Sequence, residues 1–483
     1  MSTRLSTGGR LVNKDRPLAF SFNGKSLEGY AGDTLASALL ANDQMLVGRS
    51  FKYHRPRGIV ASGVEEPNAL VNLGSGGTFE PNQRATTTEL FDGLDATSQN
   101  HWPSLEFDVG AINAKLARIM PEGFYYKMFI HPRPLWKYVY EPFIRQAAGL
   151  GKAPKVRDED TYEHFHAFCD VLVVGGGIAG LTAAKSAAAS GAQVLVLEQT
   201  AHWGGRAPVD GGSVGGTPVD KVVDELVSEL SDMPNVTLRL RTMGAGVYDH
   251  GYVLGYERLR DHAPAAQGPR HRLWRIRAGH VITATGALER PLSFAGNDIP
   301  GVMLASAVRD YVVNYGVSPG KRTVVVTNND DAYRTALTIK HAGLSVPVIL
   351  DARVPGADSP LMTAAKAAGI RVLMGHGVAK VLGGKRVTGV AICAQAGAGA
   401  VLEEIECDTV AMSGGWSPVV HLWSHCGGKL LWDSDFAMFR PDVDKAPTGQ
   451  DGTGFVSAAG AANGHFGLSE ILSDAHASGG TAA

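Results

Sequence analysis

The chain has 483 residues, 44% of them hydrophobic, and its formal charge of -2 comes from interspersed acids and bases. This balance excludes the strongly basic surface of a nucleic-acid-binding protein and predicts an ordinary globular protein of two or three domains. We expect a soluble, cytoplasmic protein without a metal site, because neither a signal-peptide-like start nor a run of about 18 apolar residues is present, and the four cysteines are widely spaced.

Residues 1–100 have the pattern of a β-grasp, ferredoxin-like module. An alternation of apolar and polar residues ends in Asn23-Gly24, a signal for a two-residue hairpin turn, and Asp33 or Thr34 can cap the helix that follows. In such modules the loop after the helix holds an iron–sulfur cluster through cysteines. Residues 1–168 contain no cysteine, so the module cannot hold a cluster through thiolates.

Residues 101–168 form a connector rich in aromatic side chains. Pro132, Pro134 and Pro142 predict an irregular segment and not a regular amphipathic helix. The rings can either pack the module onto the rest of the chain or form an interface with another protein. His164 and His166 share one face of a predicted strand, and we interpret them as structural or solvent-facing and not as metal ligands.

Residues 169–290 and 415–483 are expected to form a dinucleotide-binding domain. Gly175, Gly177 and Gly180 follow an apolar strand and open a helix, whose amino terminus can bind a pyrophosphate. Glu198 ends the next strand, where a carboxylate can bind a ribose 2′-hydroxyl and would repel the 2′-phosphate of NADP. A second glycine pair, Gly204-Gly205, follows and precedes Arg206.

Residues 291–414 are expected to be an inserted second domain of nucleotide-binding type. Where a pyridine-nucleotide site would show glycines, this domain has the sequence Asn328-Asn329-Asp330-Asp331 at a strand end. Two acids would repel a pyrophosphate, so we interpret the domain as a retained scaffold and not as an efficient NAD(P)H site.

Near the carboxyl end, Gly460 is followed by Ala461. Flavoproteins with two dinucleotide-binding domains usually have an acid at this position, which holds the ribityl chain of FAD. An alanine there removes a hydrogen-bond partner that FAD needs and NAD does not. The fold class we expect is α/β: a glutathione-reductase-like fold with two dinucleotide-binding domains, preceded by a cluster-free β-grasp module.

The chain closely resembles the alpha subunits of heterotetrameric sarcosine oxidase. The resemblance runs from about Arg10 to the end and rests on the stretches "GRSFKYHRPRGI", "GVEEPNALV", "VVGGGIAGL", "TNNDDAYRTAL" and "SGGWSPVVHL". In that family the beta subunit carries FAD and oxidises the secondary amine, FMN lies at the boundary of alpha and beta, and the alpha subunit binds NAD. Gamma and delta subunits complete the heterotetramer, and a folate-binding domain of the alpha subunit captures the formaldehyde unit. The sequence reaches Ala483 without such a domain, so we expect either a truncated or split form or a folate step on another polypeptide.

The resemblance also implies a set of residues that bind NAD. Carried over residue by residue, they are Gly175, Gly177, Ala179, Gly180, Glu198, Gln199, Gly204, Gly205, Arg206, Met243, Ala461, Phe466 and Leu468. The basic stretch from Arg49 to Arg57 is compatible with binding a phosphate of FMN or of the dinucleotide, or with a solvated loop neutralised by Glu65 and Glu66.

Two alternative functions remain open at the level of sequence. One is an FAD-binding alpha subunit of a dye-linked proline, hydroxyproline or opine dehydrogenase. The other is a self-sufficient FAD-dependent NAD(P)H oxidoreductase, which would need an acid after Gly460, a glycine turn at 327–331 and usually a redox dithiol. The chain lacks these three features, and no catalytic acid, base or nucleophile can be assigned in it.

Overall fold

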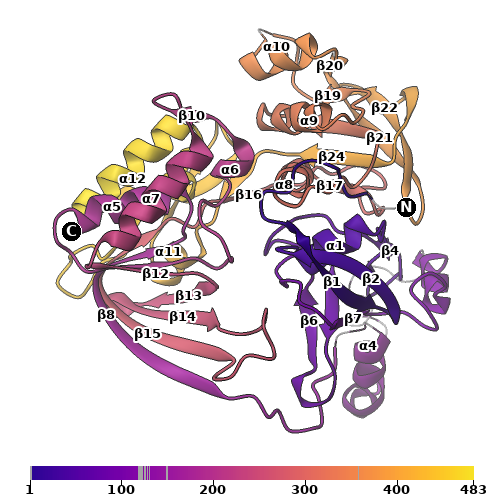
Figure 1. The fold of residues 1–483 in the computed structure, drawn as a ribbon. Coiled ribbons are helices and arrows are strands. Elements are labelled where there is room, and N and C mark those ends of the chain that lie inside the picture. The colour runs from indigo at the N-terminus through magenta and orange to yellow at the C-terminus, as the bar shows by residue number, and fades with distance from the viewer. Residues whose placement is uncertain are drawn as a thin grey trace. The chain divides into compact units, whose positions relative to one another are not determined.

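The computed structural model describes residues 3–117, 131–147, 149, 151–356 and 358–483, together with Gly123, Lys127 and Phe129. The chain forms two compact units (Figure 1). Unit 1 comprises Met1–Glu159 and Pro291–Gly414, and unit 2 comprises Asp160–Arg290 and Gly415–Ala483.

The amino-terminal part of unit 1 is a five-stranded sheet with strand order β2-β1-β7-β5-β6. Strand β1 (Asn13–Phe22) pairs with β2 (Lys25–Ala31) through a two-residue turn in which Asn23 and Gly24 both have positive φ, as a type I′ hairpin requires. The predicted hairpin is therefore confirmed. The remaining strands are β5 (Leu70–Leu73), β6 (Glu80–Arg84) and β7 (Leu94–Ser98), and the short strands β3 (Gly48–Arg49) and β4 (Pro56–Arg57) pair outside the sheet.

Helix α1 (Leu35–Ala41) packs onto this sheet and is buried along its whole length. Thr34 is its N-cap: the Thr34 hydroxyl accepts a bond from the backbone N–H of Ser37, and the Ser37 hydroxyl accepts one from the N–H of Thr34. These two reciprocal bonds satisfy donors that the first helical turn leaves free. Between two candidate caps, the structure therefore selects Thr34.

The connector contains a helical stretch that the sequence did not predict. Three consecutive segments, α3 (Arg133–Leu135), the π-helical η4 (Trp136–Tyr140) and α4 (Glu141–Ala147), run without a break. The expectation of an irregular segment is wrong here, because Pro134 lies in the first turn, where its missing N–H costs nothing, and Pro142 follows a π-turn that changes the hydrogen-bond register. The shorter η1 (Gly76–Thr78) and η2 (Val109–Ala114) precede this stretch.

The second part of unit 1 is a parallel five-stranded sheet, β17-β24-β18-β19-β20, with a three-stranded antiparallel sheet, β21-β22-β23. Helix α9 lies between α8 and α10 (Figure 1). One apolar core runs from the amino-terminal module into this part. The bounds are β17 (Val302–Leu304), α8 (Ala305–Tyr315), β18 (Thr323–Thr327), α9 (Asp331–His341), β19 (Ile349–Asp351), α10 (Pro360–Ala367), β20 (Val372–Met374), β21 (His376–Gly383), β22 (Val387–Ala394), β23 (Val401–Glu406) and β24 (Thr409–Ser413).

Unit 2 is built on a seven-stranded sheet with the order β12-β9-β8-β15-β14-β13, in which β28 also pairs with β15. The central strands are parallel, and β13 to β15 form an antiparallel meander. The strands are β8 (Tyr162–Val174), β9 (Val194–Leu197), β12 (Val236–Arg239), β13 (Thr242–Tyr248), β14 (Tyr252–Arg258), β15 (His271–Thr283) and β28 (Val456–Ala458). Strand β8 begins at Tyr162, so it includes residues that the sequence assigns to the connector.

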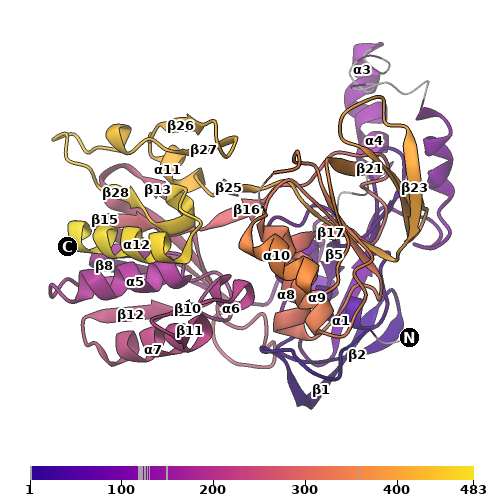
Figure 2. The ribbon, with the colours of Figure 1, turned by 90° about the horizontal axis from the view of Figure 1, so that it is seen from above.

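Helices cover one face of this sheet, with α5 lying between α12 and α7 (Figure 2). On the other face, Trp423 of α11 packs with side chains of the sheet, including those of the meander. These helices are α5 (Ile178–Ala188), α7 (Val219–Asp232), α11 (His421–His425) and α12 (Leu468–Ala482). The smaller elements are α6 (Ala207–Asp210), β10 (Ser213–Val214), β11 (Thr217–Pro218), η5 (Asp249–Gly251), β16 (Ala287–Glu289), β25 (Trp416–Pro418), β26 (Leu430–Asp433), β27 (Met438–Pro441), η6 (Val443–Lys445) and η7 (Gly460–Asn463).

Candidate dinucleotide site

The first glycine turn lies where the sequence predicts it, between the carboxyl end of β8 and the start of α5. A Cβ atom at Gly180 would lie 1.8 Å from the carbonyl oxygen of Gly175, so helix and turn pack too closely for any side chain there. Gly177 is the N-cap of α5. It differs from Gly175 and Gly180, because a Cβ added to it would meet no protein atom closer than 3.9 Å.

The open space beside Gly177 fits a bound pyrophosphate. Protein packing does not require a glycine at this position. A phosphate would require one, because a side chain would block its approach to the free N–H groups at the helix amino terminus. The residues present therefore fit the ADP half of a dinucleotide.

The second glycine pair lies against this turn. The backbone N–H of Gly204 donates to the carbonyl of Gly176 at 2.8 Å, and a Cβ at Gly205 would lie 3.1 Å from the Cα of Gly177. Arg206 pairs with Asp210 at 2.8 Å, and its guanidinium carbon is 5.2 Å from the centre of the Trp416 ring. The structure thus brings both predicted glycine segments to one place.

Glu198 is buried, and both of its carboxylate oxygens accept backbone hydrogen bonds. Oε2 accepts from Gly176 and Oε1 from Thr200, each at 2.7 Å. Each oxygen keeps a further lone pair that can accept a ribose hydroxyl. Two further predicted residues lie beside it: Gln199 is exposed, and Met243 follows Thr242, whose N–H donates to the Glu198 carbonyl at 2.7 Å.

The closing turn η7 packs against α5. Gly460 has φ +65°, and a Cβ added to it would lie 2.6 Å from the Cβ of Ala179, so a larger residue is excluded at this position. Ala461, the next residue, is half-buried. Asp474 of α12 holds the turn from behind: its carboxylate accepts from the N–H of Gly460 at 2.6 Å and from the Asn463 side chain at 3.0 Å.

Apolar side chains border this turn. The ring of Phe466 lies 5.8 Å from that of Phe436, centre to centre, and Leu468 begins α12 with its Cδ2 3.4 Å from where a Cβ of Gly212 would lie. Sequence reasoning missed Trp203, which packs over Gly176, as well as Trp416 and Asp474. The position of Trp203 directly before the glycine pair was a usable signal, whereas nothing local marks Asp474.

Comparison with known protein families gives two matches along the chain. A profile of the 2Fe-2S iron-sulfur cluster binding domain matches residues 15–101, and one of the pyridine nucleotide-disulphide oxidoreductases matches residues 169–435, more than half of the chain. The chain belongs to the pyridine nucleotide-disulphide oxidoreductase family. It is therefore a member of an oxidoreductase family with a nucleotide-binding flavoprotein fold, and the expected fold class is confirmed.

Individual relatives confirm the resemblance to sarcosine oxidase alpha subunits. The chain is 46% identical to sarcosine oxidase subunit alpha of Rhizobium meliloti over 89% of its own length and 43% of the relative's, and 36% identical to that of a Corynebacterium species over 98% and 44%. It thus spans less than half the length of these relatives. Among solved structures, L-proline dehydrogenase from P. horikoshii has the same fold, with a TM-score of 0.65 and 21% identity over 99% of this chain and 75% of that one.

The inserted domain departs from the pyridine nucleotide-disulphide oxidoreductase pattern at the start of α9. Arg353 bridges Asp330 and Asp351 at 2.7 Å each, and the Tyr333 hydroxyl donates to Asp351 at 2.8 Å. The buried Arg309 pairs with Asp331 at 2.9 Å. At the start of α9 the N–H of Asp331 donates to the side-chain oxygen of Asn329 at 3.0 Å, so an amide of the chain itself already uses one of the N–H groups that a pyrophosphate would need.

A 2Fe-2S cluster does not fit the amino-terminal module. The segment matched by the cluster-binding profile contains no cysteine, and its loop is organised around the buried Glu66 instead. The Glu66 carboxylate accepts four backbone hydrogen bonds of 2.7–2.9 Å, from Val60, Ala61, Asn68 and Ala69. Burial raises the pKa of Glu66, and these four bonds oppose that rise.

Most of the basic loop is also engaged by other segments of unit 1. The buried Arg49 donates to the carbonyl of Leu105, His54 lies 2.6 Å from Asp108, and Arg57 pairs with Asp298 at 2.6 Å. Arg55 also lies 3.7 Å from Asp298, so at least four of the five basic side chains of this loop are held by the protein itself. The loop is neither a preformed phosphate cradle nor a fully solvated segment.

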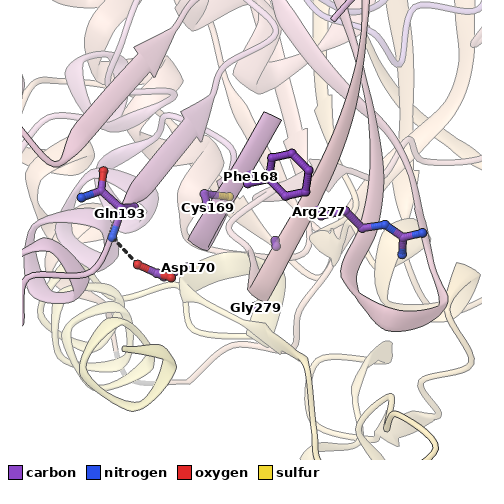
Figure 3. A pocket seen from close by; sticks show the side chains of 7 residues that line it. Phe168, Cys169, Asp170, Gln193, Arg277 and Gly279 are labelled. Atoms are coloured by element: carbon purple, nitrogen blue, oxygen red, sulfur yellow. Dashed lines mark hydrogen bonds between the residues drawn. The ribbon is translucent and has the colours of Figure 1, made fainter. Parts of the chain in front are cut away.

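The disulphide chemistry in the family's name has no counterpart here. Cys169, Cys393, Cys407 and Cys426 are all free, and burial raises the pKa of Cys169 and Cys407 to about 12. Cys169 lines a hollow of about 380 Å³ at the amino end of β9, away from the glycine turn (Figure 3). There Asp170 accepts a 2.7 Å bond from the N–H of Gln193, and no paired acid and base face the hollow.

Among the described residues, no group of three or more His, Cys, Asp or Glu side chains could hold a metal ion. His164 and His166 are both exposed on β8. In the same part of the chain, no helix has the length and apolarity needed to cross a membrane.

Proposed function

We propose that this chain is the alpha subunit of a cytoplasmic, sarcosine oxidase-like flavin amine oxidase. In this assembly it binds NAD in the first dinucleotide-binding domain and helps enclose FMN at the boundary with a beta subunit. The beta subunit carries FAD and performs the oxidative demethylation of sarcosine. Gamma and delta subunits complete the heterotetramer. In the full complex the demethylation is linked to folate. Confirmed similarity to sarcosine oxidase alpha subunits supports this assignment.

The observation that carries the choice of NAD is the turn at Gly460 and Ala461. A flavin site would use an acid after Gly460 to bind the ribityl hydroxyls, and losing one charge-assisted hydrogen bond costs about 1.5–3 kcal/mol. Here the nearby acid, Asp474, is instead bonded to Gly460 and Asn463 of the turn itself. NAD has no ribityl chain and makes no such demand.

The proposal assigns roles to the residues of the site. Gly177 and the amino terminus of α5 hold the pyrophosphate, Glu198 holds the adenosine ribose, and Met243 lies near the adenine. Arg206, Ala461, Phe466 and Leu468 surround the other half of the dinucleotide. Bound NAD would supply a nicotinamide ring capable of hydride transfer, and this chain contributes binding and orientation. The proposal divides the chain into four parts: the β-grasp module (1–100), the connector (101–168), the first dinucleotide-binding domain (169–290 with 415–483) and the inserted domain (291–414).

A spectrum of the released cofactor tests the proposal. The chain is purified alone and with its partner subunits, and the cofactor is released by heat. We expect absorbance near 260 nm without a flavin band near 450 nm from the isolated chain, and a flavin band from the complex. Stoichiometric FAD from the isolated chain would overturn the proposal.

A second candidate is the FAD-binding alpha subunit of a dye-linked dehydrogenase. The fold shared with an L-proline dehydrogenase over nearly the whole chain favours it. The same spectrum separates the two candidates, because this one requires FAD in the isolated chain.

A further inference from the structure

Large aromatic side chains are exposed over one part of unit 1. Phe107 is 70% exposed, Tyr138 72% and Phe143 73%. We call the exposed rings of Phe51, Trp102, Phe107, Tyr138 and Phe143 the aromatic surface. The core of the module does not need them, because it is already filled by buried residues such as Phe22 and Leu94.

Three chain segments carry this surface, and they meet at Asn100. The Asn100 side chain donates to the carbonyl of Ser50 at 2.7 Å, which places the loop of Phe51 beside the start of the Trp102 loop. A Cβ on Gly149 would lie 2.3 Å from the Cβ of Asn100. Gly149, two residues after the end of α4, therefore also lies against Asn100. The loops of Phe51 and Trp102 therefore lie beside the carboxyl end of the helical stretch that carries Tyr138 and Phe143.

The helix over 133–147 is too short and too exposed to be stable by itself. Isolated helices of about 12–15 residues are marginal in water, and most helices in proteins are stabilised by burying an apolar face. Trp136, Tyr140 and Ile144 are half-buried, whereas Leu135, Val139 and Phe143 are exposed. One apolar side of this helix therefore has no cover among the described residues.

The charges around the rings indicate what covers them. Arg133 and Lys137 form no ion pair with the described part of the chain, whereas Glu141 pairs with Arg145 and Glu106 with Lys25. An apolar protein surface edged by acids would complement this pattern. Anionic lipid surfaces are bound by clusters of about 4–8 basic side chains, which is more than Arg133 and Lys137 supply.

We infer that the aromatic surface is the docking site for another polypeptide, which has an apolar centre and an acidic rim, and that this polypeptide is the flavin-carrying subunit. The inference rests on the proposed function and names the surface through which that assembly forms. Exposed aromatic anchors carry most of the binding energy in protein interfaces, and the basic side chains beside them set the association rate.

The test compares assembly of variants co-expressed with the flavin-carrying amine-oxidising chain, measured by native mass spectrometry and light scattering. The double variant Tyr138→Asp with Phe143→Asp should weaken assembly at least about tenfold, as expected for buried aromatic anchors. Its dinucleotide content should stay unchanged. Phe168→Asp, at an equally exposed aromatic of unit 2, should assemble like the wild type.

A charge-reversal variant guards against misfolding of the first. Arg133→Glu with Lys137→Glu alters only exposed groups and should slow association, most strongly at low salt. Equal assembly of the wild type and both variant pairs would overturn the inference, as would equal loss in Phe168→Asp. If the wild-type chain forms dimers by itself and the aromatic double variant does not, the aromatic surface binds a second copy of this chain instead. If the wild-type chain binds phosphatidylglycerol vesicles, and the aromatic double variant alone loses this binding but assembles normally, the aromatic surface binds a membrane instead.

These outcomes separate the inference from the proposed function. If the wild-type chain fails to assemble with the flavin-carrying chain, the proposed function fails. If it assembles and the variants do so equally well, only the docking surface is wrong.

Discussion

The carboxylate of Asp474 accepts a 2.6 Å hydrogen bond from the backbone N–H of Gly460, fourteen positions earlier in the chain. The same side chain also accepts from Asn463, so one residue of α12 holds both ends of the turn η7. Ala461 lies between those two contacts. The position of the turn beside the candidate cofactor site therefore depends on a helix that follows it.

Replacing Asp474 by alanine should weaken dinucleotide binding. Loss of charge-assisted hydrogen bonds costs about 1.5–3 kcal/mol each, so we expect a dissociation constant raised at least about tenfold. Isothermal titration with NAD measures this. Asp474→Asn, which still has an acceptor for Gly460, should retain part of the affinity. Glu470→Ala, which removes only the cap at Gly467 on the same helix, is the control. Unchanged affinity in Asp474→Ala would contradict the role of the turn.

Replacing Ala461 by aspartate should shift the site toward FAD. The new carboxylate would stand where flavoproteins of this fold bind the ribityl hydroxyls, a gain of up to about 3 kcal/mol for FAD. We expect no comparable gain for NAD. Equilibrium dialysis of the apo-chain against each cofactor measures both affinities, with Ala461→Asn as a neutral comparison. A ratio of affinities that does not move would argue against a ribityl position here.

Replacing Glu66 by glutamine should destabilise unit 1. A glutamine side chain has one acceptor oxygen, so it leaves backbone donors of the loop unsatisfied, at a cost of about 2–4 kcal/mol. Urea unfolding followed by circular dichroism measures the loss. The matched control is Glu65→Gln, at the neighbouring acid outside this network. Similar midpoints for both variants would show that Glu66 does not organise the loop.

The thiols of Cys169 and Cys407 should react slowly. Because burial raises the pKa of Cys169 and Cys407 to about 12, only a fraction on the order of 10⁻⁴ of either thiol is thiolate at pH 8. Alkylation by iodoacetamide should therefore be at least about a thousandfold slower than for free cysteine, and should accelerate on unfolding in urea. Mass spectrometry of peptides follows each site. Fast modification of either thiol in the native chain is incompatible with this environment.

Acid should destabilise unit 2 partly through His280. Burial lowers the pKa of His280 in the folded chain, so the unfolded chain binds the proton more readily. Its contribution to stability is present above the unfolded pKa of about 6.5 and is lost as the pH falls below it. Thermal melts from pH 8 to 5 should show a shallower decline in His280→Gln than in the wild type. His164→Gln, altered at an exposed position of β8, is the control.

Local patterns in the sequence were sufficient for the features that depend on neighbouring residues. Asn23-Gly24 specified its hairpin because few residues adopt positive φ, and the glycines of the first turn specified the strand-turn-helix between β8 and α5. The prolines of the connector misled us, because the π-turn before Pro142 depends on a change of hydrogen-bond register that composition does not reveal.

The sequence by itself therefore determined the fold class, the absence of cluster ligands in the module and the alanine after Gly460. Only the tertiary structure decided that Asp474 faces the backbone of the turn, that Glu66 organises the cluster-free loop and that Arg353 and Arg309 pair with the acids before and within α9. Glycine turns and caps are set by short-range backbone geometry, whereas these contacts join residues that only the packing of helices and sheets brings within hydrogen-bonding distance.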